Sequence, residues 1–450
     1  MNGRGTTLAS TSSGANARAA RTGLRWAVIA LIALATVINY VDRNAFAVMW
    51  PAISKDIGGT KADYALLVTS FMVAYAVGQA LFGRLFDRIG TRWGFVIAIV
   101  GWSAAIASHA LVASVIAFAL LRAALGVFEA GNWPGATKAC AEWFPAKERA
   151  FAQGIFNAGA SLGAVVSAPL IAFAYLLLGW KGAFAAVGLI GCLWVLPWLR
   201  VYKSGPETHP GIAAAEREYI LAGRHQPGAS GDHYRPTLQQ LLRHRQSWAV
   251  ILARFFLDPV WWLFVSWLPI YLAQSFGFDI RQIGLFAWVP YVGAMLGSLS
   301  GGVLAGALMR SGRSVGGARM TTITLGGAIM LPALLLTMKA ADPLFAVLLI
   351  AAILFGFQMA IGNIQTLPSD YFGGDSVGTL AGIGGAAAVV GTLIMTWLVP
   401  VLTGVSFAPA FAMAAALVPL AVLSVWLLGG RIEPVQPLAA YSTPQGRRKR

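Results

Sequence analysis

The residues of this sequence that could do chemistry are charged side chains inside long apolar stretches. These side chains are Asp42, Arg43, Arg122, Glu129, Arg254 and Asp258. A charge at the centre of a bilayer costs about 2.5–3.5 kcal/mol on insertion scales, so intramembrane ionisable residues usually mark the path of a substrate or an ion. Arginine suits a carboxylate, because its rigid fork binds two oxygens at once and stays charged. The pattern therefore indicates an anion site with carboxylates beside it.

Arg122 and Glu129 are two helical turns apart, so they share one helix face and are separated by about 10.5 Å along the axis. Gly126 lies between them on that face, and we expect its small size to leave the guanidinium free of a tight ion pair. When an anion neutralises the arginine, Glu129 should take a proton more readily, and linkage makes this coupling reciprocal. Glu129 is therefore the main candidate proton carrier, and Asp42 is the second.

Arg254 and Asp258 are four positions apart and can pair directly, although this order of charges is the less favourable one on a helix. Two interpretations stay open, a contribution to the site or its gate and a purely structural ion pair. Polar neighbours could bond substrate hydroxyls or form ordinary interhelical hydrogen bonds. These neighbours are Asn39, Tyr40, Asn44, Tyr75, Gln79, Asn157, Ser161 and Gln358.

The composition predicts helices in a membrane around these residues. The 450 residues are 58% hydrophobic and only 11% charged, whereas soluble chains carry about 25% charged residues. Repeated apolar stretches of about 20 residues predict an all-α polytopic membrane protein. The expected twelve transmembrane helices are 24–50, 63–86, 92–110, 113–137, 149–176, 180–201, 248–275, 282–309, 319–338, 343–367, 376–400 and 404–429.

The net charge of +16 could suit a nucleic acid, but its distribution favours a lipid bilayer as the partner instead. Lysines and arginines gather in the tails, the central loop and the turns on one side of the membrane. The positive-inside rule then places both termini in the cytoplasm and the protein in the inner membrane. No phosphate-binding loop is present, so no nucleotide or other cofactor is expected, and a proton gradient would supply the energy.

The chain divides into two similar halves. We expect a disordered tail (1–23), a six-helix bundle (24–202), a cytoplasmic loop (203–247), a second six-helix bundle (248–429) and a disordered tail (430–450). "AAAEREYILAG" in the loop is typical of a short surface helix. "MWPAI" and "WLPIY" close the first helix of each half. Two packed repeats would place a ligand site between them near the membrane midplane.

Several motifs resemble a known family. "GRLFDRIGTR" looks like the major facilitator superfamily signature, which implies a cytoplasmic gate contact for Asp87 and Arg88. The chain from about 25 to 430 resembles the anion:cation symporter branch. The motifs are "NYVDRN", "RAALGVFEAGNWPG", "EWFPAKERA" and "RFFLDPVWWLFVSWLPIYL". The last is most similar to the hexuronate transporters, which import galacturonate and glucuronate with protons.

This resemblance implies roles for individual residues. Those matching Arg43, Tyr75 and Arg122 contact the sugar acid, and those matching Asp42 and Glu129 handle protons. The full set expected to bind substrate is Arg43, Tyr75, Arg122, Arg254, Asn39 and Gln358, and the gating set is Asp87, Arg88 and Asp258. We expect a monomeric symporter for protons and a monocarboxylated sugar acid, working by alternating access.

Two alternatives remain. The same scaffold could carry an aldonate, a dicarboxylate or an aromatic acid, or it could be a transport-dead sensor. An enzyme is not expected, because no span carries a nucleophile with a base.

Overall fold

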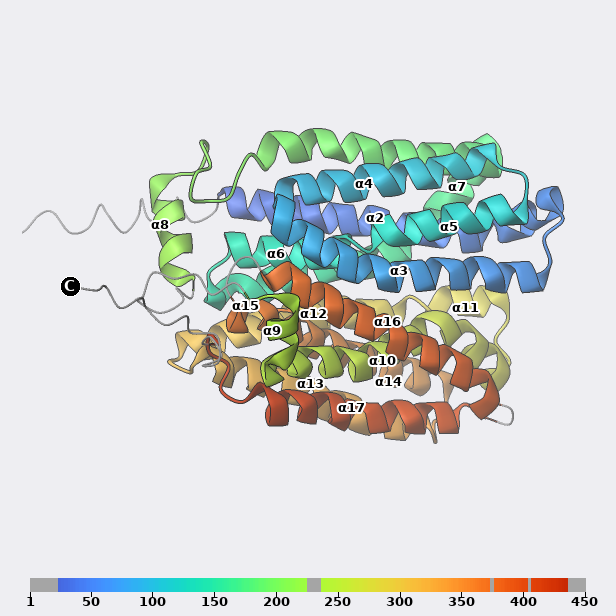
Figure 1. Cartoon of the computed structure of the whole chain (residues 1–450). Coiled ribbons are helices and arrows are strands. Elements are labelled where there is room, and N and C mark those ends of the chain that lie inside the picture. Colours follow the sequence, from blue (N-terminus) through green and yellow to red (C-terminus); the bar gives the residue numbers. More distant parts are fainter. Residues whose placement is uncertain (1–22, 225–235, 373–375, 404–405, 436–450) are drawn as a thin grey trace, which may run out of the picture.

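The computed structural model describes residues 23–224, 236–372, 376–403 and 406–435, and these residues form a bundle of long, roughly parallel helices (Figure 1). The first half contains α2 (Leu24–Ile57), α3 (Lys61–Ile89), α4 (Thr91–Ser108), η1 (His109–Leu111), α5 (Val115–Glu129), α6 (Asn132–Trp143), α7 (Ala146–Val201) and α8 (Ala214–Gly223). The second half contains α9 (Leu238–Arg243), α10 (Arg245–Phe276), α11 (Ile280–Phe286), α12 (Val289–Arg310), α13 (Val315–Thr337), α14 (Pro343–Ile364), α15 (Leu367–Tyr371), α16 (Val377–Leu402) and α17 (Ala408–Gly429).

The described helices provide the twelve crossings that the sequence predicts. Eleven helical segments are long and apolar enough to cross a membrane, and the longest is α7 with 56 residues. Gly179 divides α7 into two crossings, because its φ of 65° and ψ of 177° are not helical. Positive φ favours glycine, which has no Cβ to clash with the backbone. The fourth crossing consists of α5 and α6 together, since Ala130 and Gly131 between them keep right-handed helical φ and ψ.

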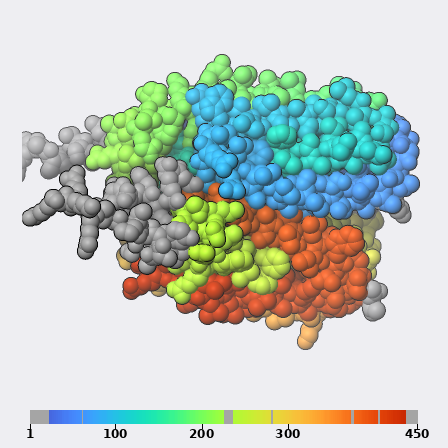
Figure 2. Space-filling model, in the orientation of Figure 1, coloured from blue at the N-terminus to red at the C-terminus, as the bar shows by residue number. Residues whose placement is uncertain are grey.

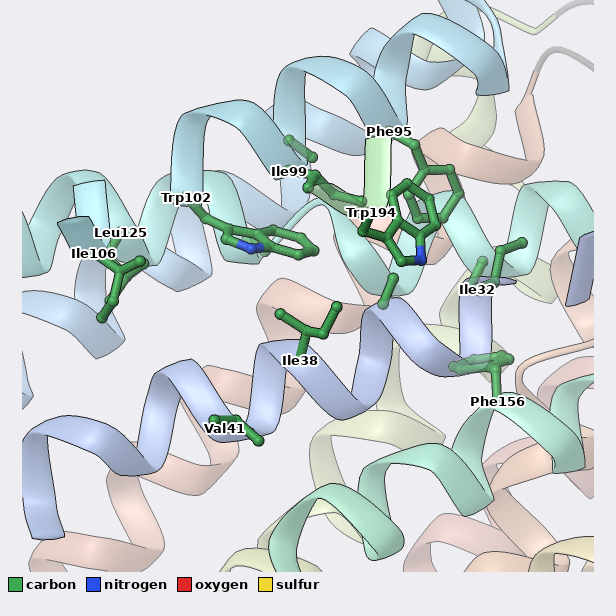
Figure 3. Packing of buried hydrophobic residues seen from close by; sticks show 14 of the residues in the cluster. Ile32, Ile38, Val41, Phe95, Ile99, Trp102, Ile106, Leu125, Phe156 and Trp194 are labelled. Atoms are coloured by element: carbon green, nitrogen blue, oxygen red, sulfur yellow. The ribbon is translucent and has the colours of Figure 1, made fainter. Parts of the chain in front are cut away.

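Each half has its own hydrophobic core. Figure 3 shows part of the first core, where Trp102 of α4, Trp194 of α7 and Ile38 of α2 lie among other buried side chains. A separate cluster joins α10 to α14, α16 and α17 in the second half. The space-filling view shows the two halves as two bodies in contact along their length (Figure 2). Van der Waals packing of these buried side chains therefore joins the helices within each half.

Close helix packing joins the two halves. A Cβ on Gly83 of α3 would lie 2.3 Å from the carbonyl oxygen of Gly378 of α16. A Cβ on Gly302 of α12 would lie 2.4 Å from the Cα of Phe151 of α7. Small residues at such crossings let backbones approach closely in a membrane.

The expected surface helix in the central loop is a helix, α8, but it is docked rather than free. Ile220 is fully buried, and Glu216 accepts hydrogen bonds from the Leu24 backbone N (3.1 Å) and Arg25 Nη1 (3.0 Å). Glu148 accepts from Arg25 Nε (3.1 Å) and from the Tyr219 hydroxyl (2.7 Å). The stretch "AAAEREYILAG" predicted the helix, whereas its partner at the start of α2 comes from a distant segment of the chain. We call this end of the bundle the α8 end and the other the far end.

Candidate functional site

A cavity of about 50 Å³ lies between the two halves, with room for a few water molecules. Its lining comes from α2, α3, α6 and α7 on one side and from α10, α14 and α16 on the other. The lining residues are Tyr40, Arg43, Tyr75, Gln79, Trp133, Asn157, Arg254, Asp258, Trp261, Trp262, Phe357, Gln358, Ile361, Gln365, Gly385, Ala388 and Val389. The cavity thus collects residues from both repeats, as the sequence-based interpretation expects of a ligand site.

Arg43 is the centre of the first-half wall. Its Nε and Nη2 donate to Glu129 Oε2 at 3.3 and 3.2 Å, and Nη2 also donates to Asn39 Oδ1 at 3.3 Å. Its guanidinium lies 4.8 Å from the Tyr75 ring centroid and 5.6 Å from that of Trp262. Arg43 therefore does not stand free for an anion, because a buried carboxylate already pairs with it.

Arg122 does not reach the cavity. Its guanidinium lies between the rings of Phe46 and Phe71, 4.6 and 4.5 Å from their centroids. Its Nε and Nη1 are buried and have no hydrogen-bond partner in the described part of the chain. The space expected at Gly126 is filled, since a Cβ there would lie 2.4 Å from the Phe71 carbonyl oxygen. The close approach of α3 removes that space and brings the Phe71 ring to the guanidinium.

Glu129 forms no ion pair with Arg122 in the described part of the chain, as the sequence predicts. Glu129 does share a helix with Arg122, but its partner is Arg43 of α2, and its own side chain is 0% exposed. Spacing along one helix predicts which side chains share a face. It does not predict a closer partner from a neighbouring helix.

Asp42 is adjacent to Arg43 in sequence but has a different environment. It is fully buried, it does not line the cavity, and neither carboxylate oxygen has a hydrogen-bond partner among the described residues. Glu129 does not line the cavity either, but its partner Arg43 does.

Arg254 and Asp258 pair within α10 and both line the cavity. Arg254 Nη2 lies 2.9 Å from Asp258 Oδ1, and Nε donates to Oδ2 at 3.3 Å. Asp258, which we expected at a gate, is therefore part of the cavity wall. Of the two interpretations of this pair, its position favours a contribution to the site.

Amides and aromatic rings complete the wall. Gln79 and Gln358 line the cavity, and the Oε1 of each is buried without a hydrogen-bond partner in the described residues. Asn157 Nδ2 donates to Gln365 Oε1 across the two halves at 2.8 Å. Sequence reasoning missed Trp133, Trp261 and Phe357. The adjacent Trp261 and Trp262, three and four residues after Asp258, were the available signal for an aromatic wall on that helix.

The α8 end is closed by charged contacts between the halves. Asp87 of α3 accepts from Lys138 Nζ (2.9 Å), from the Gly378 backbone N (3.1 Å), and from Thr379 N and Oγ1 (2.6 Å each). Gly378 and Thr379 are in the first turn of α16, and a helix N-terminus attracts an anion. Arg88 is exposed and makes no hydrogen bond or ion pair within the described chain. Of Asp87 and Arg88, only Asp87 forms a contact between the halves in the described chain.

A second charged contact at this end was not anticipated. Asp370 accepts from Arg149 Nη1 of the first half at 2.8 Å and from Arg319 Nε of the second half at 3.0 Å. Arg319 Nη2 also donates to the Ala146 carbonyl oxygen at 3.0 Å. The sequence suggested that both arginines belong to turns at the membrane surface. Arg149 and Arg319 are instead buried, with 3% and 0% of their surface exposed. Among the residues that the structure describes, no three His, Cys, Asp or Glu side chains form a group that could hold a metal ion.

Comparisons with known proteins agree with this architecture. The Major Facilitator Superfamily model matches residues 32–396. The chain is 33% identical to the hexuronate transporter of Escherichia coli (strain K12) over 406 residues, which cover 90% of this chain and 94% of that protein. It is 36% identical to the galacturonate transporter of Dickeya chrysanthemi over 282 residues, or 63% of this chain and 81% of that protein.

Two further similarities complete the comparison. The D-galactonate transporter of Escherichia coli O6:H1 is 31% identical over 426 residues, which cover 91% of this chain and 97% of that protein. The solved structure of the proton:xylose symporter XylE matches with a TM-score of 0.68 at 16% identity, covering 92% of this chain and 97% of that one. The last match concerns the fold alone. The family model and these relatives together show that the chain belongs to the major facilitator superfamily, as a membrane transporter and not an enzyme.

Proposed function

We propose that this protein imports a monocarboxylated sugar acid of the hexuronate class together with protons. The observation that carries the proposal is the buried pair of Arg43 and Glu129 at the wall of a cavity between the two halves. The hexuronate and galacturonate transporters among its relatives support the substrate class.

Coupling follows from the competition for Arg43. A substrate carboxylate that binds the Nε and Nη2 of Arg43 must displace Glu129, which accepts from both. The Glu129 side chain is fully buried, and an ionised carboxylate without a partner is costly in such a place. Glu129 would therefore leave Arg43 as the neutral acid, so that binding of the anion and binding of the proton favour one another.

The remaining charged residues have subordinate roles in this proposal. Asp42 would exchange a second proton, because its buried carboxylate has no hydrogen-bond partner in the described chain. Arg122 would contribute a positive charge to the interior of the first half. It would contact the substrate only after a rearrangement, since it does not line the cavity in this conformation.

Alternating access would open and close the two ends of the bundle in turn. Hydrogen bonds between the halves lie at the cavity or toward the α8 end. They include those of Asp87, Arg149, Gln153 and Asn157. The basic charges of the tails and of the central loop place that end in the cytoplasm in our proposal. This conformation would then be sealed toward the cytoplasm. The cavity is too small for a sugar acid, so the halves must part at the far end to admit one.

An aldonate is the second candidate substrate. The D-galactonate transporter among the relatives shares most of its length with this chain. An aldonate also has one carboxylate and several hydroxyls, so the same pairing argument holds for it. Competition between galacturonate and galactonate for uptake would separate the two.

The test is uptake of labelled galacturonate into proteoliposomes with an imposed inward proton gradient. We expect wild type to accumulate the label and Glu129→Gln to fail to do so, while counterflow exchange persists because a neutral side chain leaves Arg43 available. The matched control is Glu218→Gln on α8, since Glu218 is exposed and should not affect uptake. If folded wild type accumulates no hexuronate but transports other acids, the proposed substrate is wrong. If Glu129→Gln still accumulates the label, the proposed proton site is wrong.

A further inference from the structure

The second-half wall of the cavity differs in charge from the first. We propose that Asp258, through its pair with Arg254, makes this wall bind the uncharged hydroxyl-bearing end of the substrate and exclude a second carboxylate. This inference rests on the proposed function, since it concerns the selectivity of the same cavity. It assigns a role in specificity to a residue that the coupling argument does not use.

The geometry of the pair leaves both donors and acceptors available. Two of the Arg254 nitrogens, Nε and Nη2, are engaged by the two Asp258 oxygens. Arginine has five N–H donors and a carboxylate has about four acceptor sites, so each partner keeps unused capacity. The side chains are 9% and 13% exposed, and both line the cavity. A hydroxyl, which donates and accepts, fits such a surface, whereas a carboxylate can only accept.

Once Glu129 binds a proton, the two walls of the cavity differ in net charge. With Glu129 neutral, Arg43 presents a full positive charge to one carboxylate. Arg254 is neutralised by a partner that lies four residues along the same helix and moves with it. Its stem lies beside α16, where a Cβ added to Gly384 would be 3.4 Å from Arg254 Cδ. The cavity therefore offers one uncompensated cation and suits one carboxylate.

The amides of the wall favour a hydroxyl-rich ligand. Gln79 and Gln358 both line the cavity. The Oε1 atom of each is buried and has no hydrogen-bond partner in the described chain. These oxygens need donors, which sugar hydroxyls provide and carboxylates do not. Gly385 allows the arrangement, because a Cβ there would lie 2.4 Å from Gln79 Oε1.

The test compares a monoacid with a diacid of the same carbon skeleton. Unlabelled galacturonate and galactarate compete with labelled galacturonate in the proteoliposome assay, for wild type, Asp258→Asn and the charge-retaining control Asp258→Glu. We expect wild type and Asp258→Glu to prefer galacturonate. Asp258→Asn should shift the ratio of inhibitory concentrations toward galactarate by at least about tenfold, since like charges in contact are strongly unfavourable. Arg254 also loses its partner and can bind the second carboxylate.

Two results would overturn the inference, namely wild type that does not discriminate between the acids and Asp258→Asn with an unchanged ratio. If Asp258→Asn does not yield a monodisperse protein, Asp258→Ser removes the same charge and takes its place. Failure of the proposed function would look different, because wild type would then accumulate no galacturonate at all.

Discussion

Asp87 joins the two halves at the α8 end, and its removal should favour conformations in which that end is open. Its carboxylate accepts three hydrogen bonds from the first turn of α16, two from backbone N–H groups and one from the Thr379 hydroxyl. Water replaces these bonds when the halves part, so each bond to the carboxylate contributes a net of about 1.5 kcal/mol, the lower end of the range for a charged group. Asp87→Ala should therefore cost the sealed conformation about 4.5 kcal/mol, which shifts the equilibrium about 2,000-fold.

The partner of Asp87 within its own half requires a control. Lys138 is 4% exposed and pairs with Asp87 at 2.9 Å, so Asp87→Ala leaves a buried ammonium without that carboxylate. This loss lowers stability whichever end is open, because both residues belong to the first half. Lys138→Met keeps the three bonds to α16 and should therefore keep the sealed conformation.

Distances between spin labels at the α8 end would measure the shift. Arg88 and Arg310 are exposed at the ends of α3 and α12, and cysteines there can carry labels once Cys140 and Cys192 are replaced. We expect wild type and Lys138→Met to share a short-distance population and Asp87→Ala to gain a longer one. Identical distance distributions in all three proteins would refute the reasoning, since the contact between the halves would then contribute nothing to the closure.

Two further predictions concern the second charged contact and the cavity wall. Asp370→Asn should lower stability by about 3–5 kcal/mol, because Arg149 and Arg319 lose a shared buried carboxylate; an unchanged melting temperature in detergent would contradict this. Gly385→Ala should raise KM several-fold by displacing the Gln79 amide, with kcat little changed. Gly384→Ala is the control, because its nearest neighbours lie at 3.4 Å, and an equal effect there would argue against the contact with Gln79.

The crossings could be predicted from the sequence because they depend on local properties. Apolar length fixes how much chain spans a membrane, and each predicted span overlaps one or two described helices. The fourth crossing also follows the prediction, since Ala130 and Gly131 between α5 and α6 keep right-handed helical φ and ψ.

The members of the site could be predicted better than their partners. A buried charge stands out in an apolar stretch whatever it contacts, so Arg43, Glu129, Arg254 and Asp258 were all visible in the sequence. The partner of Glu129 comes from another helix, and no spacing rule relates the two. The partner of Arg149 and Arg319 could not be predicted either. The sequence places both arginines near turns, and the carboxylate that they share, Asp370, is distant in the chain.

The ion pairs of this protein fall into two kinds, and the difference bears on how a substrate could move the halves. Arg43 with Glu129 and Arg254 with Asp258 each lie within one half, so a rocking motion leaves them intact. Arg149 with Asp370, by contrast, spans the halves and must break. A ligand held at one end by Arg43 and at the other by the pair on α10 would tie the two halves together. At the cavity, no ion pair of the described chain connects the two halves. In our proposal the substrate makes that connection, and it thereby changes the relative free energies of the conformations.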